Sequence, residues 1–351
     1  MGKAVRASQT ANPNIGVADT PLLSSEYTEG LVSIIIPIFN RAGMVCEALD
    51  SLSIQDYSNI ELILVDDGST DQLKDALENW VACNRKMKLQ LVHQTNKGAA
   101  TARNHGMRRS MGEFIYFLDS DDLVLPQSIS LLVAALQKAR APYALGRIVN
   151  TDISGTMLND QSLTVWRQSR EAILLNQWMT HAALYRRSAI RAIGRYNEAL
   201  PIGEDTEFHW RMAARNGLGA GIDNIVAYRR SHCFGQLSDL DDVNRTNHTN
   251  DVFNSFQKWS LELNLLTPLD RRILRSRHVK NAVQSGASGN WLEKEQSLAM
   301  IKQLYPNGFQ RILLLGRPKL GPYFFVLKLL ISAIEKAAMF RRKIWKRRDM
   351  F

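Results

Sequence analysis

The run LVSIIIPIF at residues 31–39 is short, apolar and rich in β-branched residues. Such a run is typical of a strand that is buried on both faces of a sheet. A segment with helical spacing of its apolar residues follows it, and this alternation repeats along the chain. We expect strands over 31–39, 60–67, 88–94 and 113–119, and helices over 43–55, 71–83, 97–110 and 126–139. Strands and helices that alternate with short links predict an α/β fold with a parallel sheet covered on both faces.

The pattern beyond residue 140 is weaker but still predicts further elements. Strands are expected over 143–150 and 220–230, and helices over 167–176, 187–193, 204–216 and about 240–305. The first 30 residues are polar, lack period and hold no apolar signal sequence, so we expect a disordered lead there. The predicted organisation is a lead over 1–30, an α/β domain over 31–235 and a helical C-terminal region over 236–351.

The composition is that of a soluble globular protein. Of the 351 residues, 45% are hydrophobic and 22% are charged, which excludes a mainly disordered, collagenous or polytopic membrane protein. Three cysteines without a CxxC pair favour a reducing, cytoplasmic setting. Ten basic and two acidic residues lie in 317–351, so this tail carries +8 of the net charge of +10. Because a nucleic-acid enzyme spreads basic residues along its groove, we expect no nucleic-acid partner.

Polar segments follow each of the first four predicted strands. They are residues 37–41, 65–71, 96–104 and 118–122. In open parallel sheets, ligands bind beyond the carboxyl ends of the strands. A single polar segment is commonplace, since Asp and Gly also form turns and helix caps. Four such segments at one edge predict a ligand site.

Three carboxylates within four residues, Asp119, Asp121 and Asp122, form the sharpest motif. They repel one another unless water or a cation neutralises them. Hard oxygen ligands select Mg²⁺ or Mn²⁺, and such an ion commonly also ligates substrate phosphates. The alternative is a helix N-cap with an acidic turn before Pro126, which explains one of the three. The chain has neither GxGxxG after the first strand nor GxxxxGK[ST], so we expect neither a dinucleotide-binding motif nor a P-loop.

Other residues at the predicted edge of the sheet could each have a functional or a purely structural role. Asp67 can accept a hydrogen bond from a base or ribose, and Arg103 either pairs with an anion or is solvated. Glu204 and Asp205 open a predicted helix, where carboxylates compensate the helix dipole or remove a proton from an attacking hydroxyl. His232 follows the strand predicted over 220–230, and it is a candidate ligand only if a metal binds nearby.

Taken together, the motifs VSIIIPIFN, LVDDGSTD, NKGAATARNHG and FIYFLDSDD resemble the signature of the family 2 glycosyltransferases of the GT-A fold, of the bacterial polysaccharide-biosynthesis type. GEDTEFHWRM resembles the later acidic motif of that family. The resemblance covers about residues 31–235. It implies a GT-A domain that performs an inverting sugar transfer from a nucleotide-diphosphate sugar, assisted by Mg²⁺ or Mn²⁺. The QxxRW motif and membrane spans of chain-synthesising members are not found, which favours transfer of single sugars.

The resemblance also implies roles for individual residues. It assigns nucleotide-sugar binding to Pro37, Phe39, Asn40, Asp67, Gly98, Arg103, Asp119 and Ser120. It assigns metal binding to Asp119, Asp121, Asp122 and His232. Asp205 matches the catalytic base, with Glu204 beside it, and Trp178 and His181 fall where an acceptor pocket would form. The expected acceptor is a lipid-linked or growing polysaccharide glycan.

Two other functions remain open from the residues. A nucleotidyltransferase would share the sheet and the metal, but it should carry a Gly-rich basic loop where residues 37–40 read PIFN. A non-catalytic protein would use the basic tail to hold membrane or nucleic acid. Intact carboxylates in both acidic motifs argue against lost chemistry.

The basic tail predicts no membrane span. Its apolar runs over 322–348 are interrupted by Lys328, Glu335 and Lys336, and each charge at a bilayer centre costs about 2.5–3.5 kcal/mol. A span also needs roughly 20 apolar residues. Read as a helix, the tail has an apolar side, and Trp345 with the final basic cluster suits an anionic membrane surface. The alternatives are a helix that packs on its own domain and a solvated tail. We expect a cytoplasmic protein, peripheral on the inner face of the plasma membrane.

Overall fold

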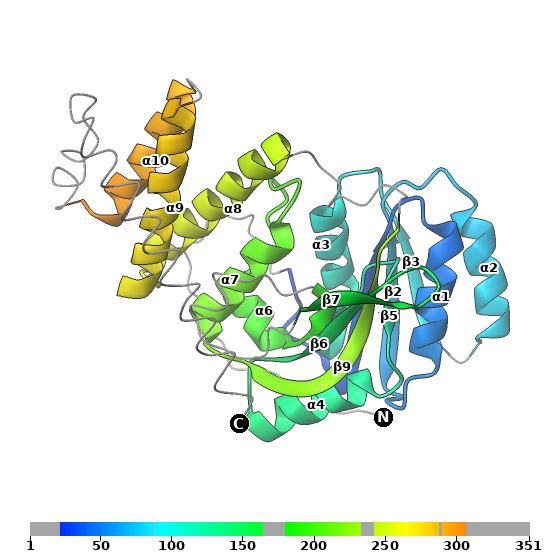
Figure 1. The fold of residues 1–351 in the computed structure, drawn as a ribbon. Coiled ribbons are helices and arrows are strands. Elements are labelled where there is room, and N and C mark those ends of the chain that lie inside the picture. Colours follow the sequence, from blue (N-terminus) through cyan, green and yellow to red (C-terminus); the bar gives the residue numbers. More distant parts are fainter. Residues whose placement is uncertain (1–21, 86, 164–179, 233–241, 288–289, 307–351) are drawn as a thin grey trace. The chain divides into compact units, whose positions relative to one another are not determined.

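The computed structural model describes residues 22–85, 87–163, 180–232, 242–287 and 290–306. They form two compact units, one up to Phe256 and one from Gln257 onward. The first unit contains a mixed nine-stranded sheet flanked by helices, and the second is helical (Figure 1). The predicted α/β fold with a helical C-terminal region is therefore confirmed.

Four parallel strands form the first half of the sheet, in the order β3–β2–β1–β4. Their bounds are β1 (Thr28–Ile38), β2 (Ile60–Asp66), β3 (Lys88–His93) and β4 (Gly112–Phe117). Val32 in β1 pairs with Ile60 on one side and with Phe114 on the other, and all three side chains are buried. The apolar runs of the sequence thus form the core of a parallel sheet, as predicted.

The helices between these strands cover both faces of the sheet. Helices α1 (Ala42–Ser53) and α2 (Leu73–Cys83) lie on one face, and α3 (Ala99–Arg109) lies on the other (Figure 1). Helix α3 sits so close to β1 that a Cβ atom on Gly106 would lie 2.3 Å from Ile35 Cγ2. Only glycine fits there without movement, and this contact positions the helix turn that carries Arg103.

The second half of the sheet changes direction. Strand β8 (Ala183–Arg186) is antiparallel to both β4 and β6 (Tyr143–Thr151), while β9 (Ala220–Arg230) is parallel to β6. Strands β5 (Leu123–Val124) and β7 (Met157–Leu163) pair antiparallel with β9 and β6. The sequence predicts β6 and β9 but misses β5, β7 and β8. Strands of two and four residues, such as β5 and β8, are too short to show a period.

The other elements of the first unit are helical. They are α4 (Ser128–Ala139), the 3₁₀ turn η1 (Thr180–Ala182), α6 (Arg187–Ile193) and α7 (Glu204–Asn216). Helix α4 begins two residues later than the helix predicted over 126–139. Helix α7 is anchored by Arg211, which hydrogen-bonds Glu207 at 2.8–2.9 Å and the carbonyl oxygens of Ile193 and Arg195 at 2.6 and 2.8 Å. The helix expected over 167–176 lies outside the described residues.

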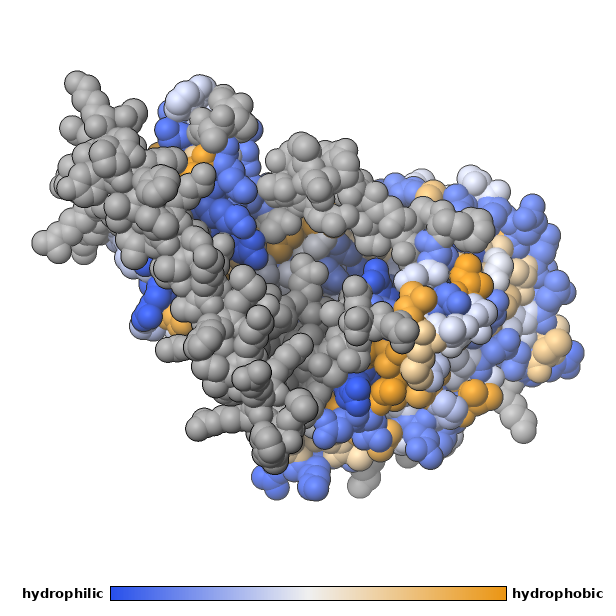
Figure 2. Space-filling view, in the orientation of Figure 1, coloured by the Kyte–Doolittle hydropathy of each residue, from blue (hydrophilic) through white to orange (hydrophobic). Residues whose placement is uncertain are grey.

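The C-terminal helices are α8 (Asp242–Glu262), α9 (Pro268–Ala287) and α10 (Trp291–Leu304). In the second unit, Gln257 joins His278 to the carbonyl of Met300 through contacts of 2.9 and 2.8 Å. No helix among the described residues is long and apolar enough to cross a membrane. Hydrophilic and hydrophobic residues mix on the face shown in Figure 2, and exposed Met157 and Leu158 come from β7. The basic tail lies outside the described residues.

Candidate active site

The ends of β1 and β2 are tied together by Asn40. Its backbone N–H donates to Ser69 Oγ at 3.0 Å, and its Oδ1 accepts from the N–H of Thr70 at 2.8 Å. Asn40 has a φ of +53°, in the left-handed region that asparagine tolerates better than most residues. The neighbouring Phe39 is 43% exposed, and Pro37 remains in β1 beside β2. The first two polar segments of the predicted edge therefore meet.

The buried carboxylate of Asp67 fastens the loop that precedes α3. Its Oδ1 accepts hydrogen bonds from Gln94 Nε2 and from the N–H of Lys97, and its Oδ2 accepts one from the N–H of Gly98, all at 2.8 Å. Gly98 has a φ of +87°, which favours glycine. In this structure Asp67 thus holds the loop of Gly98, another predicted nucleotide-binding residue.

Arg103 on α3 joins the two acidic motifs. Its Nη1 donates to Glu204 Oε1 at 2.6 Å, and its Nη2 donates to Asp119 Oδ1 at 2.8 Å. Its guanidinium also lies 5.4 Å from the ring centre of Tyr196, within cation–π range. Burial alone would lower the pKa of Arg103, but Asp119 and Glu204 raise it well above its ordinary value. The bridge holds two segments that are far apart in the chain.

Two carboxylate–histidine groups form around the acidic turn, residues 119–122. In one group, ligand atoms of Asp119, Asp122 and His181 lie within 4.8 Å of one another. His181 Nδ1 is 3.1 Å from Asp122 Oδ2 and 3.9 Å from Asp119 Oδ2. In the other group, Asp121 Oδ2 lies 2.9 Å from Nε2 of the buried His232. The structure thus brings all the predicted metal ligands to one turn and adds His181 to them.

Arg230, the last residue of β9, fixes the acidic turn. Its N–H donates to Asp122 Oδ1 at 2.9 Å, and its guanidinium hydrogen-bonds the carbonyl oxygen of Asp121 and pairs with Glu47 on α1. Strand β9 therefore supplies Arg230 at its end, and His232 follows the strand by two residues. Ser120 is buried within the turn.

The protonation of the turn fits a site for a cation. Burial raises the pKa of Asp122 well above its ordinary value, and Asp121 and Asp119 raise it further. Burial also raises the pKa of Asp119, but Arg103 and His181 bring it below the ordinary value. Burial lowers the pKa of His181 to about 4, and neither of its ring nitrogens has a hydrogen-bond partner among the described residues. Carboxylates beside a neutral imidazole are a donor set that suits a divalent transition-metal ion.

Helix α7 places Glu204 and Asp205 in its first turn. Gly203 precedes them with a φ of +75°, and a Cβ atom there would lie 2.7 Å from Val252 Cγ2. Asp205 Oδ1 accepts from the N–H of Thr206 at 2.6 Å, whereas Glu204 is held by Arg103. Burial raises the pKa of both carboxyls against the opposing effect of Arg103. Asp205 therefore has a raised pKa and, unlike Glu204, is not hydrogen-bonded by the guanidinium of Arg103.

Some contacts in the candidate site could not be predicted from the sequence. Arg230 and Glu47 lie 183 residues apart, and nothing in either segment indicates their pairing. His181, expected in an acceptor pocket, lies buried against the carboxylates of the acidic turn. Trp178, the other expected acceptor residue, lies outside the described residues.

Comparison with known proteins finds one matching family model and relatives that align with only part of the chain. A family model described as Glycosyl transferase family 2 matches residues 33–194. The chain is 34% identical over 113 residues to the Campylobacter jejuni protein named GalNAc(5)-diNAcBac-PP-undecaprenol beta-1,3-glucosyltransferase. The aligned region covers 32% of this chain and 36% of that protein. The chain spans between 15% and 65% of the length of the curated relatives that it matches.

Solved structures share the fold over most of the chain. One is S. aureus TarS 1–349 in complex with UDP-GlcNAc, with a TM-score of 0.63, 20% identity, and coverage of 78% of this chain and 81% of that chain. Another is the mannosyltransferase PcManGT from Pyrobaculum calidifontis in complex with GDP-Man and Mn²⁺, with a TM-score of 0.55, 19% identity, and coverage of 87% and 86%. At these identities the likeness shows the GT-A fold.

The Arg103 bridge predicts the effect of a conservative change. We expect Arg103→Lys to lower the free energy of unfolding of the first unit by about 1–3 kcal/mol, because one ammonium cannot reach both carboxylates as a planar guanidinium does. Urea denaturation measures this loss. Arg108→Lys, at an exposed site on the same helix, is the control and should change stability by no more than about 0.5 kcal/mol. Equal losses in the two variants would contradict the bridge.

Proposed function

We propose that this chain, which carries a family 2 glycosyltransferase domain over residues 33–194, transfers a sugar from a nucleotide-diphosphate sugar to an acceptor hydroxyl. The observation that carries the proposal is the contact of Arg103 with both Asp119 and Glu204. This contact brings the acidic turn, which suits a metal ion and a diphosphate, close to the first turn of α7, where Asp205 suits proton removal. The UDP-GlcNAc in the complex of the S. aureus neighbour supports a nucleotide sugar as the donor.

The acidic turn is the proposed diphosphate side of the site. Asp121 and His232 would hold a divalent cation, with Asp119, Asp122 and His181 beside them. When bound, Mg²⁺ or Mn²⁺ supplies positive charge that stabilises the departing diphosphate. The Mn²⁺ in the Pyrobaculum complex supports such an ion here. Pro37, exposed Phe39 and Asn40 would contact the nucleoside, and Asp67 would shape the adjoining loop.

Asp205 is the proposed catalytic base. Its raised pKa makes it a better proton acceptor than an ordinary aspartate, while Glu204 is held by the guanidinium of Arg103. Asp205 takes the proton of the acceptor hydroxyl as the oxygen attacks the anomeric carbon from the face opposite the diphosphate. A single displacement of this kind inverts the configuration at that carbon. The transition state would have oxocarbenium character.

The proposed acceptor is a lipid-linked or growing polysaccharide glycan at a membrane surface. The name of the Campylobacter relative, which contains an undecaprenol-linked glycan, supports this class. The basic tail would hold the enzyme at the inner face of the plasma membrane by charge and by its apolar side. The Campylobacter relative is named as a glucosyltransferase, which does not support the nucleotidyltransferase alternative.

We expect Asp205→Asn to bind the donor but to lose turnover by a factor of about 10²–10⁴ or more, because the amide cannot accept the proton. Calorimetry measures donor binding, and release of nucleoside diphosphate measures turnover. Asp223→Asn, at an exposed site on β9, is the control and should behave like the wild type. Equal losses in donor affinity and in turnover would point to a structural or metal-binding role instead.

The metal assignment predicts that Asp121→Asn abolishes transfer and the dependence of donor binding on Mg²⁺ or Mn²⁺, while the far-UV circular dichroism stays unchanged. Paramagnetic resonance of added Mn²⁺ gives a readout independent of activity. Asp75→Asn, exposed on α2, removes the same charge away from the site and should leave Mn²⁺ binding unaltered. Wild-type Mn²⁺ affinity in Asp121→Asn would refute the assignment.

The membrane proposal predicts that the full chain sediments with vesicles that contain phosphatidylglycerol. Salt should weaken the binding without abolishing it, because each basic residue contributes about 1 kcal/mol that salt screens, whereas the apolar contact persists. A chain that ends at Gly316 should stay in solution and still release nucleoside diphosphate. Attachment that resists both high salt and alkaline carbonate would indicate an integral segment, and loss of folding on truncation would show that the tail packs on its own domain.

A further inference from the structure

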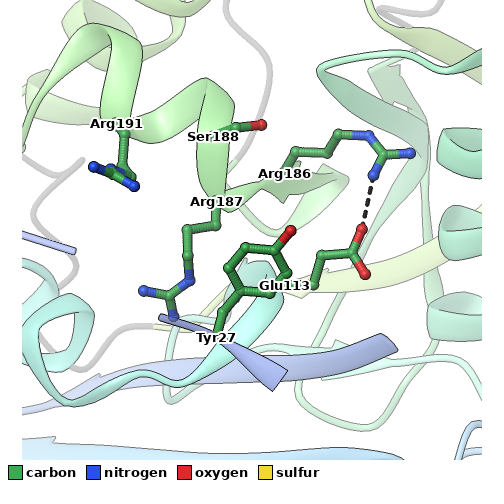
Figure 3. A pocket seen from close by; sticks show the side chains of 6 residues that line it. All are labelled: Tyr27, Glu113, Arg186, Arg187, Ser188 and Arg191. Atoms are coloured by element: carbon green, nitrogen blue, oxygen red, sulfur yellow. Dashed lines mark hydrogen bonds and ion pairs between the residues drawn. The ribbon is translucent and has the colours of Figure 1, made fainter. Parts of the chain in front are cut away.

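A basic cavity lies at the end of the sheet opposite the acidic turn. Asp119 follows the carboxyl end of β4, whereas the cavity includes Glu113, at the start of that strand. The cavity has a volume of about 90 Å³. Six residues line it: Tyr27, Glu113, Arg186, Arg187, Ser188 and Arg191 (Figure 3). Three arginines and one glutamate give the lining a formal charge of +2.

The one carboxylate in the lining is already engaged. Glu113 Oε1 accepts a hydrogen bond from Arg186 Nη1 at 2.9 Å, as Figure 3 shows, and its Oε2 accepts one from the N–H of Gly30 at 3.0 Å. Arg186 also donates to the carbonyl oxygens of Ala141 and Leu136. This pair is therefore neutral and fixed. The remaining positive charge of the lining belongs to Arg187 and Arg191, and Glu61, outside the lining, offsets part of the charge of Arg187.

Arg187 holds an unused donor at this cavity. Its side chain is almost fully buried, with 2% exposure. Nε donates to the carbonyl oxygen of Gly112 at 2.6 Å, and Nη2 donates to the carbonyl oxygen and the hydroxyl of Ser110 at 2.8 and 3.1 Å. Nη1 is buried and has no hydrogen-bond partner among the described residues. A buried charged donor without a partner is costly, and an anion in the cavity would lower that cost by attraction to the guanidinium.

Burial lowers the pKa of Arg187 to about 10, so the guanidinium is charged at neutral pH but is held in surroundings that disfavour the charge. A bound anion would compensate that charge. The space is too small for a nucleotide but admits several waters or one tetrahedral oxyanion. A phosphate monoester carries about −1.5 to −2 charges at neutral pH, which matches the charge of the lining.

We propose that this cavity binds a single phosphate group, free or as a monoester, through Arg191, with the buried positive charge of Arg187 in the cavity wall. The hydroxyls of Ser188 and Tyr27, which also line the cavity, supply further donors. The site is separate from the acidic turn and does not require a metal. It therefore stands whether or not the chain transfers sugars.

The test uses the full chain with divalent cations chelated, so that the acidic turn has no cation with which to hold phosphate. Inorganic phosphate is titrated at constant ionic strength against chloride, and binding is followed by calorimetry and by the shift in Tm. Arg191→Gln should weaken binding by about tenfold, the loss expected for one charge-assisted hydrogen bond. Arg191 is exposed, so this change should leave the fold intact, whereas Arg187 also holds the backbone. Arg215→Gln, exposed on α7, is the matched control and should bind like the wild type.

A second arm separates the two sources of phosphate. Vesicles with phosphatidic acid, a monoester, are compared with vesicles with phosphatidylglycerol, a diester. Arg191-dependent binding of inorganic phosphate supports a free phosphate, and Arg191-dependent preference for phosphatidic acid supports a lipid headgroup. If neither probe depends on Arg191, or if Arg215→Gln loses as much binding as Arg191→Gln, the proposal is wrong.

Discussion

The buried guanidinium of Arg103 is the interaction on which the candidate site depends. It is the cation that lets Asp119 and Glu204 approach within hydrogen-bond distance of a common partner. Removing one partner of a buried ion pair commonly costs several kcal/mol, because the remaining charge stays buried without compensation. The position of Arg103 depends in turn on the close seat of α3 on β1, which only the absence of a side chain at Gly106 permits. A single glycine contact in the core thereby sets the geometry of charges at the sheet edge.

The acidic turn is held in place without being neutralised. Arg230 uses its backbone N–H on Asp122 and its guanidinium on the carbonyl of Asp121, so its positive charge is not paired directly with a carboxylate of the turn. The pKa of Asp122 is raised by burial and by the neighbouring charges of Asp121 and Asp119, which is a sign of this incomplete compensation. A turn fully satisfied by salt bridges would be more stable by itself and less able to take a cation.

The part of the fold that follows from local pattern could be predicted from the sequence, and the part that depends on distant contacts could not. The runs of β1 to β4 predict a parallel sheet because each is long enough to be recognised as a strand and because helices alternate with them. Strand β8 has four residues, and its antiparallel place beside β4 follows from tertiary packing. The carboxylates of the acidic turn were predicted because they are adjacent in sequence. The position of His181 beside Asp122 is set by the turn η1 before β8, for which the sequence has no periodic signal.

The late place of β9 in the chain bears on how the protein matures during synthesis. Arg230 and His232 contact residues of the acidic turn that lie 108 to 111 positions earlier, and β9 pairs with β5 and β6 in the sheet. Contacts between residues so far apart in sequence form slowly, because the chain must lose the entropy of closing a large loop before the contacts can stabilise it. A nascent chain that has not yet emerged through residue 232 has its acidic turn in full but lacks the residues that fix it. The ribosome-bound intermediate would thus hold a cluster of mutually repelling carboxylates without these contacts, and completion of β9 would be the step that sets the geometry of the turn.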